Sequence, residues 1–345
     1  MRQIIFSLLI FSTLAHAKFP ERFDSALETV AFGSCNRDEL PQPVWPAVEA
    51  HKPDLWIWGG DNIYADWYAP PEGPKIDYTV NREWLIQRYA AQFNRPDYAA
   101  FRKKTPIIGT WDDHDYGRNN AGADYPLKAV SRDLALTFME VPLSDPRWTR
   151  EGLYGSYDFG PAGRRTRIIL TDNRYFASSP KSTDATMLGS AQKEWIEKQL
   201  RESGAELHLI VSGSQFISDQ HRWDSWQKYE EEREWLLELI RETEQRVVFL
   251  SGDRHIHEIS VLNDPSLPYP LVDITSSGLT HSWENFPGEA NPHRHGDVFA
   301  GLGFGLIRID WSGESPRVHL EIRDAENQLQ NKYSTDFEHS PQIDR

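Results

Sequence analysis

Short apolar runs, each closed by glycine or a polar residue, recur along the chain and predict buried β-strands. Through residue 250 these runs alternate with segments of helical periodicity, whereas the last part of the chain contains mostly strands. We expect strands at residues 29–35, 55–58, 105–111, 153–159, 167–171, 207–211, 247–250, 258–262, 271–275, 305–311 and 317–323. We expect helices at residues 43–50, 82–101 with an interruption near Pro96, 128–139, 189–200 and 226–241.

This order of elements predicts an α/β fold. Two mixed β-sheets would pack face to face as a sandwich, flanked by helices, to make four layers. No repeat, low-complexity segment or linker interrupts residues 18–345, so we expect that stretch to form a single domain.

The amino terminus has the pattern of an export signal. Arg2 precedes an apolar run over residues 4–14, and residues 15–17 resemble a cleavage site. The run is too short to cross a bilayer, and no later stretch approaches a membrane span. We expect residues 1–17 to be a Sec-type signal peptide and the mature protein to be periplasmic or secreted.

Composition narrows the classes of partner. The formal net charge of −15 disfavours binding to nucleic acids or anionic membranes. Cys35 is the only cysteine, so no internal disulfide is expected, and an exported protein would keep such a thiol buried or in use. Most of the 13 tryptophans are expected in the core or in cleft walls.

Four predicted strands end in side chains that bind metals. Open α/β sheets place their chemistry at the carboxyl ends of the strands, so these four ends are expected to converge. At one of them, Gly59 and Gly60 allow a sharp turn just before Asp61. The metal-binding side chains are Cys35, Asp61 with Tyr64, the run Asp112 to Asp115, and Asp253 with His255.

The ligand types form two sets. A first set offers sulfur, phenolate oxygen, nitrogen and a carboxylate, which suits a transition metal such as ferric iron. A second set offers only carboxylate oxygens, which suits calcium or magnesium. The first set is Cys35, Asp61, Tyr64 and His255, and the second is Asp61, Asp113 and Asp253. With Asp61 shared, a two-metal centre would clamp a phosphoryl group and activate water or hydroxide for in-line attack.

Neighbouring residues are candidates for catalysis and substrate binding. His114, next to Asp115, is suited to act as a general acid for an alkoxide leaving group, although it could also be a structural histidine on a turn. His257 shares a strand face with His255 and could be a ligand, a supporting group or neither. Phosphate oxygens could be held by Arg118, Asn119, Asn120 and Arg254, or these side chains could simply be solvated.

These stretches together resemble the alkaline phosphatase D-like (PhoD-like) branch of the metallophosphatases. The resemblance covers roughly residues 28–280, and the family's helix-flanked β-sandwich agrees with the predicted strands. It implies a phosphoric ester hydrolase, an alkaline phosphatase or phosphodiesterase. The matching stretches are residues 32–35, 60–64, 110–115, 188–189 with Gln192 and Trp195, and 251–255.

The resemblance also implies ligands. Ferric iron would be held by the first set, and calcium would share the Asp61 bridge and use Asp253. Purple acid phosphatases, more distant relatives, have an Asn-His pair where this chain has Asp113-His114, which makes Asp113 a ligand and His114 the acid. Asn119 or Asn120 could supply that ligand instead of Asp113, and magnesium could replace calcium.

Some family features are absent from the sequence. There is no twin-arginine pair and no amino-terminal β-domain, so metal loading could follow export and the cleft could be more open. The histidine that many metallophosphatases place between the two halves of the site is not evident. Residues 212–215 stand there instead, which favours an oxygen-ligated second metal.

The sequence therefore predicts an exported, metal-dependent hydrolase of small-molecule phosphoesters. A rival interpretation is a secreted glycan- or surface-binding protein that stacks its ligands on tryptophan. A third is an inactive descendant that keeps its metals for stability, against which the retained His114 argues mildly. Metal analysis combined with p-nitrophenyl phosphate and bis-p-nitrophenyl phosphate assays distinguishes them.

Overall fold

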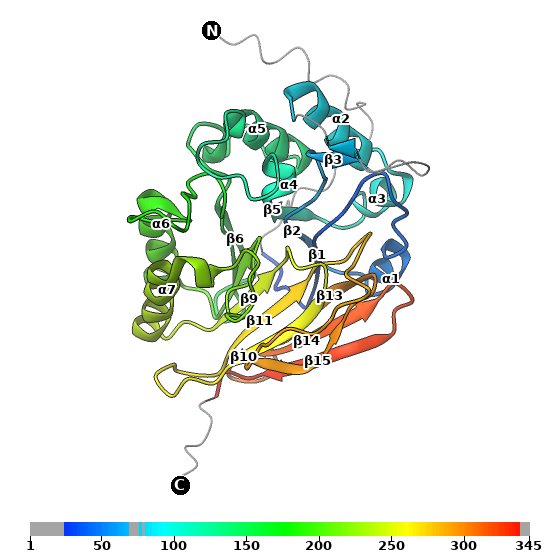
Figure 1. The fold of residues 1–345 in the computed structure, drawn as a ribbon. Coiled ribbons are helices and arrows are strands. Elements are labelled where there is room, and N and C mark those ends of the chain that lie inside the picture. The colour runs from blue at the N-terminus through cyan, green and yellow to red at the C-terminus, as the bar shows by residue number, and fades with distance from the viewer. Residues whose placement is uncertain (1–23, 69–75, 78–79, 339–345) are drawn as a thin grey trace.

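The computed structural model describes residues 24–68, 76–77 and 80–338. The predicted signal peptide, residues 1–17, lies outside the described residues. Two mixed β-sheets face each other, and helices cover their outer faces (Figure 1), which confirms the predicted α/β sandwich. Among the described residues, no helix combines the length and apolar character needed to span a membrane.

The first sheet has six strands in the order β15-β14-β13-β1-β2-β5. The strands β1, β2 and β5 run parallel at one end of the sheet, with Phe32 beside Ile57 and Ile57 beside Ile108. The strands β13, β14 and β15 continue the sheet from β1 in antiparallel pairs. The six strands are β1 (Thr29–Gly33), β2 (Leu55–Gly59), β5 (Ile107–Thr110), β13 (Gly303–Asp310), β14 (Arg317–Asp324) and β15 (Leu329–Thr335).

The second sheet has seven strands in the order β12-β10-β11-β9-β8-β7-β6. The four strands β7, β8, β9 and β11 run parallel, and the outer strands pair antiparallel. The seven strands are β6 (Gly155–Phe159), β7 (Thr166–Leu170), β8 (Leu207–Ser212), β9 (Val247–Ser251), β10 (His257–Leu262), β11 (Leu271–Ser276) and β12 (Arg294–Phe299). A separate two-stranded ribbon pairs β3 (Trp67–Tyr68) with β4 (Ile76–Asp77).

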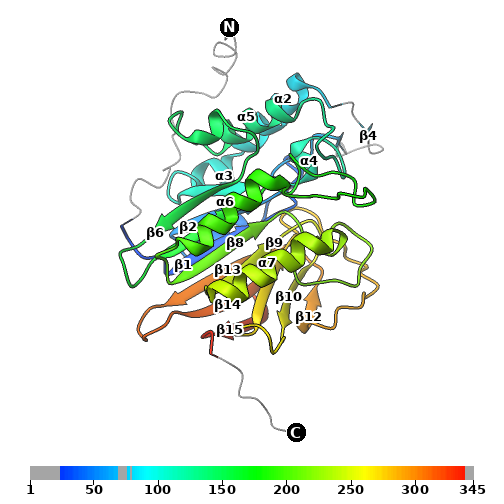
Figure 2. The same ribbon diagram turned by 90° about the vertical axis from the view of Figure 1, so that its left-hand side faces the viewer.

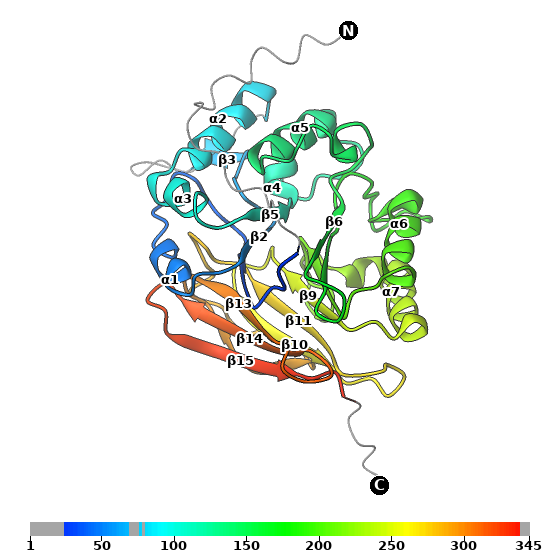
Figure 3. The same ribbon diagram turned by 180° about the vertical axis from the view of Figure 1, so that it is seen from behind.

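Helices form the two outer layers. Helices α6 and α7 lie across the second sheet (Figure 2), and α1, α2, α3 and α5 lie on the side of the first sheet (Figure 3). The helices are α1 (Trp45–Ala50), α2 (Arg82–Phe93), α3 (Pro96–Phe101), α4 (Asp113–Tyr116), α5 (Lys128–Phe138), α6 (Gly189–Arg201) and α7 (Glu230–Thr243), with 3-10 turns η1 (Pro146–Trp148) and η2 (Trp226–Tyr229).

Three apolar layers explain why the strands read as continuous hydrophobic runs. Phe32, Ile57 and Leu250 belong to the core between the sheets. Trp56 and Trp58, also on the first sheet, pack instead against the helices of its outer side. Phe249 belongs to the third core, between the second sheet and α6 and α7. A strand covered on both faces has no solvent side to place polar residues on.

The structure adds elements that the pattern did not predict. β12 and β15 are edge strands with mostly exposed or half-buried residues, so they lack an apolar face that sequence could reveal. The predicted helix at 82–101 is divided into α2 and α3 by Pro96, as expected. The predicted helix at 226–241 begins instead with the 3-10 turn η2 before α7.

The arrangement brings the carboxyl ends of strands from both sheets together. β1, β2 and β5 end on one side, and β9 ends facing them across the sandwich. A parallel bridge between Ser34 and Ser277 links the chain just beyond β1 to the chain just beyond β11. The chain just beyond β1, β2, β5 and β9 carries the metal-binding side chains Cys35, Asp61, Asp113 and Asp253.

Candidate metal centre

The predicted strand ends meet in three overlapping groups of ligand atoms. In each group the atoms lie within 4.8 Å of one another. Asp61 is common to the first two groups, and Asp113 is common to the last two, so the groups form one continuous centre. The groups are Cys35, Asp61 and His255; Asp61, Asp113 and His114; and Asp112, Asp113 and Asp253.

Backbone conformation at these strand ends is unusual. Cys35, Asp61, Asp253 and His255 have φ angles of 61°, 50°, 68° and 53°, in the left-handed region that non-glycine residues seldom adopt. Such conformations persist where the surrounding structure enforces them, and they concentrate at functional sites. The turns that follow β1 and β2 are joined by the Asn36 amide, which donates to the Asp61 carbonyl at 2.8 Å.

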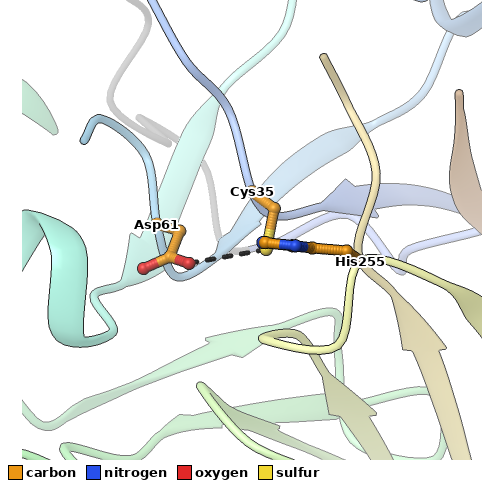
Figure 4. A group of neighbouring side chains, drawn as sticks. All are labelled: Cys35, Asp61 and His255. Atoms are coloured by element: carbon orange, nitrogen blue, oxygen red, sulfur yellow. Dashed lines mark hydrogen bonds between the residues drawn. The ribbon is translucent and has the colours of Figure 1, made fainter. Parts of the chain in front are cut away.

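The first group is linked by its own hydrogen bonds. The three side chains point toward one another (Figure 4), and Cys35 Sγ lies 3.5 Å from Asp61 Oδ2. The Tyr64 hydroxyl donates to Asp61 Oδ2 at 3.1 Å and lies 2.9 Å from His255 Nε2. All four members of the predicted iron set are therefore in contact.

Protonation in this group depends on a cation. Burial, reinforced by the charge of Asp61, raises the pKa of the Cys35 thiol and of the Tyr64 phenol above their ordinary values. Burial lowers the pKa of His255 to about 4, so its imidazole is neutral at pH 7. A bound cation would be required to keep the thiol and the phenol ionised, as metal ligands must be.

The third group offers bare carboxylate oxygens. Within the described residues, Asp112 Oδ2 and Asp113 Oδ1 are buried and accept no hydrogen bond. Burial raises the pKa of Asp253 to about 7 and that of Asp112 to about 8. Buried oxygens without donors are costly unless something compensates them, and a hard, oxygen-binding cation fits this donor set.

Arg174 is a member of the centre that the sequence did not single out. Its Nε donates to Asp112 Oδ1 at 2.6 Å, and its Nη1 donates to Asp224 Oδ2 at 2.8 Å. The guanidinium is buried and offsets part of the negative charge of the third group. The available signal was the polar run Asp172 to Arg174 directly after β7, which matched the pattern of the other strand ends.

His114 lies where the three groups meet. Its Nδ1 is 2.7 Å from Asp66 Oδ1, its Nε2 is 4.0 Å from Asp113 Oδ1, and its ring stacks on Tyr64 at 4.1 Å between centroids. Burial opposes the charged imidazole, but Asp113 and Asp61 outweigh it and raise the pKa of His114 to about 10. Asp66 was not predicted, because nothing in its loop identifies it as the partner of a distant histidine.

Asp115 is buried beside the centre, but its oxygens are already engaged. Oδ2 accepts from the Asn62 amide at 3.1 Å and from Asn62 Nδ2 at 2.6 Å, while Oδ1 accepts from the Asp112 amide at 2.8 Å. The carboxylate thus ties the loop after β2 to the start of α4. This placement suits a residue that positions ligands.

The predicted phosphate-binding residues lie around the centre. Arg118 and Asn119 are exposed, and the Asn119 amide donates to Asp66 Oδ2 at 2.9 Å. The Asn120 amide donates to Asp113 Oδ2 at 2.6 Å, so its backbone contacts that carboxylate. Arg254 is buried and forms an ion pair with Glu289.

The two alternative histidine ligands are placed differently. The His281 ring lies 4.4 Å from the His255 ring and 5.0 Å from the Tyr64 ring, at the border of the first group. His257 is buried on β10, 5.5 Å from the Phe299 ring. In the part of the chain that the structure describes, neither joins a group of converging ligand atoms.

Comparisons with known proteins bear on the fold and on the family. Among curated proteins, none matches the chain. The fold is similar to the solved structure of PhoD, with 18% identity and a TM-score of 0.75 over 91% of this chain and 70% of that one. It is also similar to GAP50, the anchor in the inner membrane complex of Plasmodium, with 12% identity and a TM-score of 0.58 over 92% of this chain and 91% of that one.

The family assignment comes from the sequence itself. A family model described as PhoD-like phosphatase matches residues 30–291, which include every member of the three ligand groups. The resemblance noted from the short motifs is thereby confirmed. This chain belongs to the PhoD-like phosphatases and is a metal-dependent phosphoester hydrolase.

Proposed function

We propose that the protein hydrolyses small-molecule phosphomonoesters or phosphodiesters at a two-cation centre. The observation that carries the proposal is the continuity of the three ligand groups through Asp61 and Asp113. The sulfur, phenol and imidazole of the first group suit ferric iron. The oxygen ligands Asp61, Asp113 and Asp253, with Asp112 beside them, suit calcium, or magnesium in its place.

The chain's own groups divide the work of the reaction. Two bound cations would neutralise the phosphoryl oxygens and lower the pKa of the attacking water. His114 donates a proton from Nε2 to the leaving alkoxide oxygen, while Asp66 accepts from Nδ1 and fixes the ring. Asp115, predicted as catalytic, acts in this proposal by holding the Asp61 and Asp112 loops together.

Phosphate oxygens are assigned to Arg254, Arg118 and Asn119. Arg254 stands in the sequence between Asp253 of the third group and His255 of the first group. Its side chain is buried, and the described residues offer no acceptor to its Nε. Arginine suits this role because its planar fork matches phosphate oxygens. Arg118 and Asn119 lie exposed on the loop that follows α4, within reach of a substrate entering from solvent.

Export is also part of the proposal. The charged, apolar and small-residue segments in residues 1–17 support a Sec-type signal, and the buried Cys35 is compatible with an oxidising compartment. Amino-terminal sequencing of protein recovered from the periplasm or medium should begin at Lys18. Recovery of only the intact chain from the cytoplasm would overturn this element.

The test of the function is metal analysis with paired assays. We expect purified protein to contain iron, to show a visible charge-transfer band from Tyr64 and Cys35, and to hydrolyse p-nitrophenyl phosphate, bis-p-nitrophenyl phosphate or both. Colourless, iron-free protein with full activity would refute the iron assignment. Metal-replete protein with no activity on either ester would refute the catalytic assignment.

The rival glycan-binding function has little support in the structure. Stacking on sugars requires exposed aromatic rings. The side chains of Trp45, Trp56, Trp58, Trp111 and Trp226 are at most 2% exposed and belong to the core. Trp223 is an exposed tryptophan, at 37%, and its indole nitrogen already donates to Glu289.

A further inference from the structure

A cavity of about 580 Å³ adjoins the third ligand group. Its wall residues come from the loop that precedes α5, the loop that follows β7 and the turn before α7. Helices α5 and α7 are labelled in Figure 2. The size of the cavity is that of a small-molecule site. The walls include Asn120, Asp124, Arg174, Ser178, Asp224 and Tyr229.

The cavity is joined to the centre by two of its wall residues. Asn120 donates its amide to Asp113, and Arg174 donates its guanidinium to Asp112. Both carboxylates belong to the group that also contains Asp253. A phosphoester with its phosphoryl group at the centre would therefore have space here for the alcohol that leaves.

The charge of the cavity is negative. Asp224 is a wall residue that pairs with both Arg174 and Lys228, and Arg174 also pairs with Asp112. The exposed wall residue Asp124 forms no ion pair with the described residues, so it carries the negative charge that a ligand would meet. An alcohol carrying a second phosphate or a carboxylate would meet this field unfavourably. A positively charged alcohol would gain from it.

The aromatic wall fits the same class of ligand. Tyr229 is half-buried, and its hydroxyl donates to the carbonyl of Ser178, another wall residue, at 2.9 Å, which holds the ring in place. An ammonium group is attracted to the face of a fixed aromatic ring as well as to carboxylates. Small wall residues, among them Ala121, Gly122 and Ala177, leave room for the alcohol chain.

We propose that this cavity binds the alcohol part of the phosphoester and selects amino alcohols over alcohols that carry a further negative charge. The inference rests on the proposed function, because it needs a phosphoryl group at the centre. Asp124 and Tyr229 are the residues that set this preference. Asp224 contributes charge, but it also holds Arg174 and so cannot be changed without disturbing the centre.

The test uses three monoesters of matched size on metal-replete protein. They are 2-aminoethyl phosphate, 2-hydroxyethyl phosphate and phosphoglycolate, which differ in the charge of the alcohol. We expect kcat/KM to fall in that order, by about fivefold per step, the effect of one charge pair at about 4 Å in water. High salt should reduce the spread, because exposed charges are screened.

Two variants locate the effect. Asp124→Lys should lower the ratio of kcat/KM for the amine over the acid by at least about tenfold, since it replaces an attraction with a repulsion. Tyr229→Leu should lower kcat/KM for 2-aminoethyl phosphate and leave kcat/KM for the other two esters unchanged. The control is Glu314→Lys, the same charge change on the exposed turn between β13 and β14, which is at the opposite end of β13 from the centre; it should leave the ratio unchanged.

The outcomes separate the two proposals. If the protein hydrolyses p-nitrophenyl phosphate but treats the three monoesters alike, or prefers phosphoglycolate, the cavity assignment is wrong and the proposed function stands. An equal shift of the ratio in Asp124→Lys and Glu314→Lys would also overturn it. If no phosphoester is hydrolysed by metal-replete protein, the proposed function fails first.

Discussion

The two ends of the metal centre differ in how they are stabilised without a cation. In the first group, Tyr64 and Cys35 hydrogen-bond to Asp61, so the buried polar atoms have partners within the group. In the third group, Asp112 Oδ2 and Asp113 Oδ1 are buried and accept no hydrogen bond from the described residues, and the charge is offset by Arg174, His114 and Arg254. The first group is pre-formed by neutral contacts, whereas the third depends on electrostatic compensation.

This contrast has a physical consequence for the two cations. In the first group the thiol and the phenol must lose their protons before they can bind a metal ion. Metal binding there is therefore decided by the chemistry of the ligands. In the third group the buried carboxylates repel one another until a cation binds. Cation binding there is therefore driven by charge, and it contributes more to the stability of the fold. Substitutions and chelators should therefore affect the two ends in different ways.

The largest effect is expected at His114, which lies between the two ends. His114→Ala should reduce turnover by about 10²–10⁴-fold through loss of the proton donor, while both metals stay bound. The loss should be smaller for p-nitrophenyl phosphate than for an alkyl phosphate, since a good leaving group needs less protonation. Equal losses for both esters, or loss of metal, would show that His114 is a ligand or a phosphate-binding group.

A pair of ligand substitutions tests the independence of the two ends. Cys35→Ser should remove iron and colour and lower activity by at least about 100-fold, with a stability change of about 1–2 kcal/mol. Asp253→Asn should weaken calcium binding before it affects iron. Element analysis of each variant measures this directly, and loss of both metals from both variants would mean that the ends form one cooperative site.

Chelation should act on the oxygen-rich end alone. EGTA is expected to abolish activity and to leave the visible band, and calcium should restore turnover. When the free calcium concentration is 100 times the Kd, removal of calcium lowers the free energy of unfolding by about 2.7 kcal/mol. Thermal unfolding can detect this loss as a lower Tm. Restoration by zinc alone would mean that a nitrogen ligand has been missed, and His281 or His257 would then be the residue to test.

The pH dependence of stability should differ between metal-free and calcium-loaded protein. Burial raises the pKa of Asp253 to about 7 and that of Asp112 to about 8, well above the ordinary value of 3.8. The folded chain then binds these protons more tightly than the unfolded chain, so their contribution is lost as pH rises through 7 and 8. We expect the Tm of metal-free protein to fall from about pH 5 to pH 8 and to level off above pH 8.

Calcium should make that fall shallower, because it compensates the ionised carboxylates. Asp253→Asn supplies the control, since an amide cannot ionise and should weaken the pH dependence even without calcium. A Tm that rises over this interval in metal-free protein would contradict the charge assignment of the third group. Circular dichroism at matched ionic strength is a suitable measurement.

The smallest effect is expected at Ser277, behind the first group. Its Oγ lies 2.9 Å from Cys35 Sγ and accepts from the His255 amide at 2.6 Å, so its proton is available to the sulfur. Ser277→Ala should shift the iron–thiolate band and change activity by about tenfold or less. An unchanged spectrum with lower stability would assign Ser277 to packing alone.

Much of the fold was accessible from the pattern of residues. The strands that are covered on both faces, such as β2 and β9, are continuous apolar runs whose type and position follow from their burial. The edge strands β12 and β15 were missed because solvent covers much of them and their residues carry no distinct period. The same reasoning explains why interior elements were predicted with better boundaries than peripheral ones.

Some residues of the candidate site could be predicted from the sequence, and others could not. Cys35, Asp61, Tyr64, Asp113 and His255 were accessible because each follows a strand whose end could be located in the sequence. Asp66, Arg174 and Ser277 were not assigned, because their roles depend on which distant side chain each one contacts.

Local sequence thus decided which side chains stand at the strand ends, since the apolar runs of β1, β2, β5 and β9 stop just before these polar residues. Tertiary structure decided how those ends are paired. The order of strands in the two sheets places β1 beside β2 and brings β9 across the sandwich, so that Cys35 meets Asp61 and His255. Packing also buries Asp112 and Asp113 without donors, and that desolvation, which no linear pattern encodes, creates the demand for a cation.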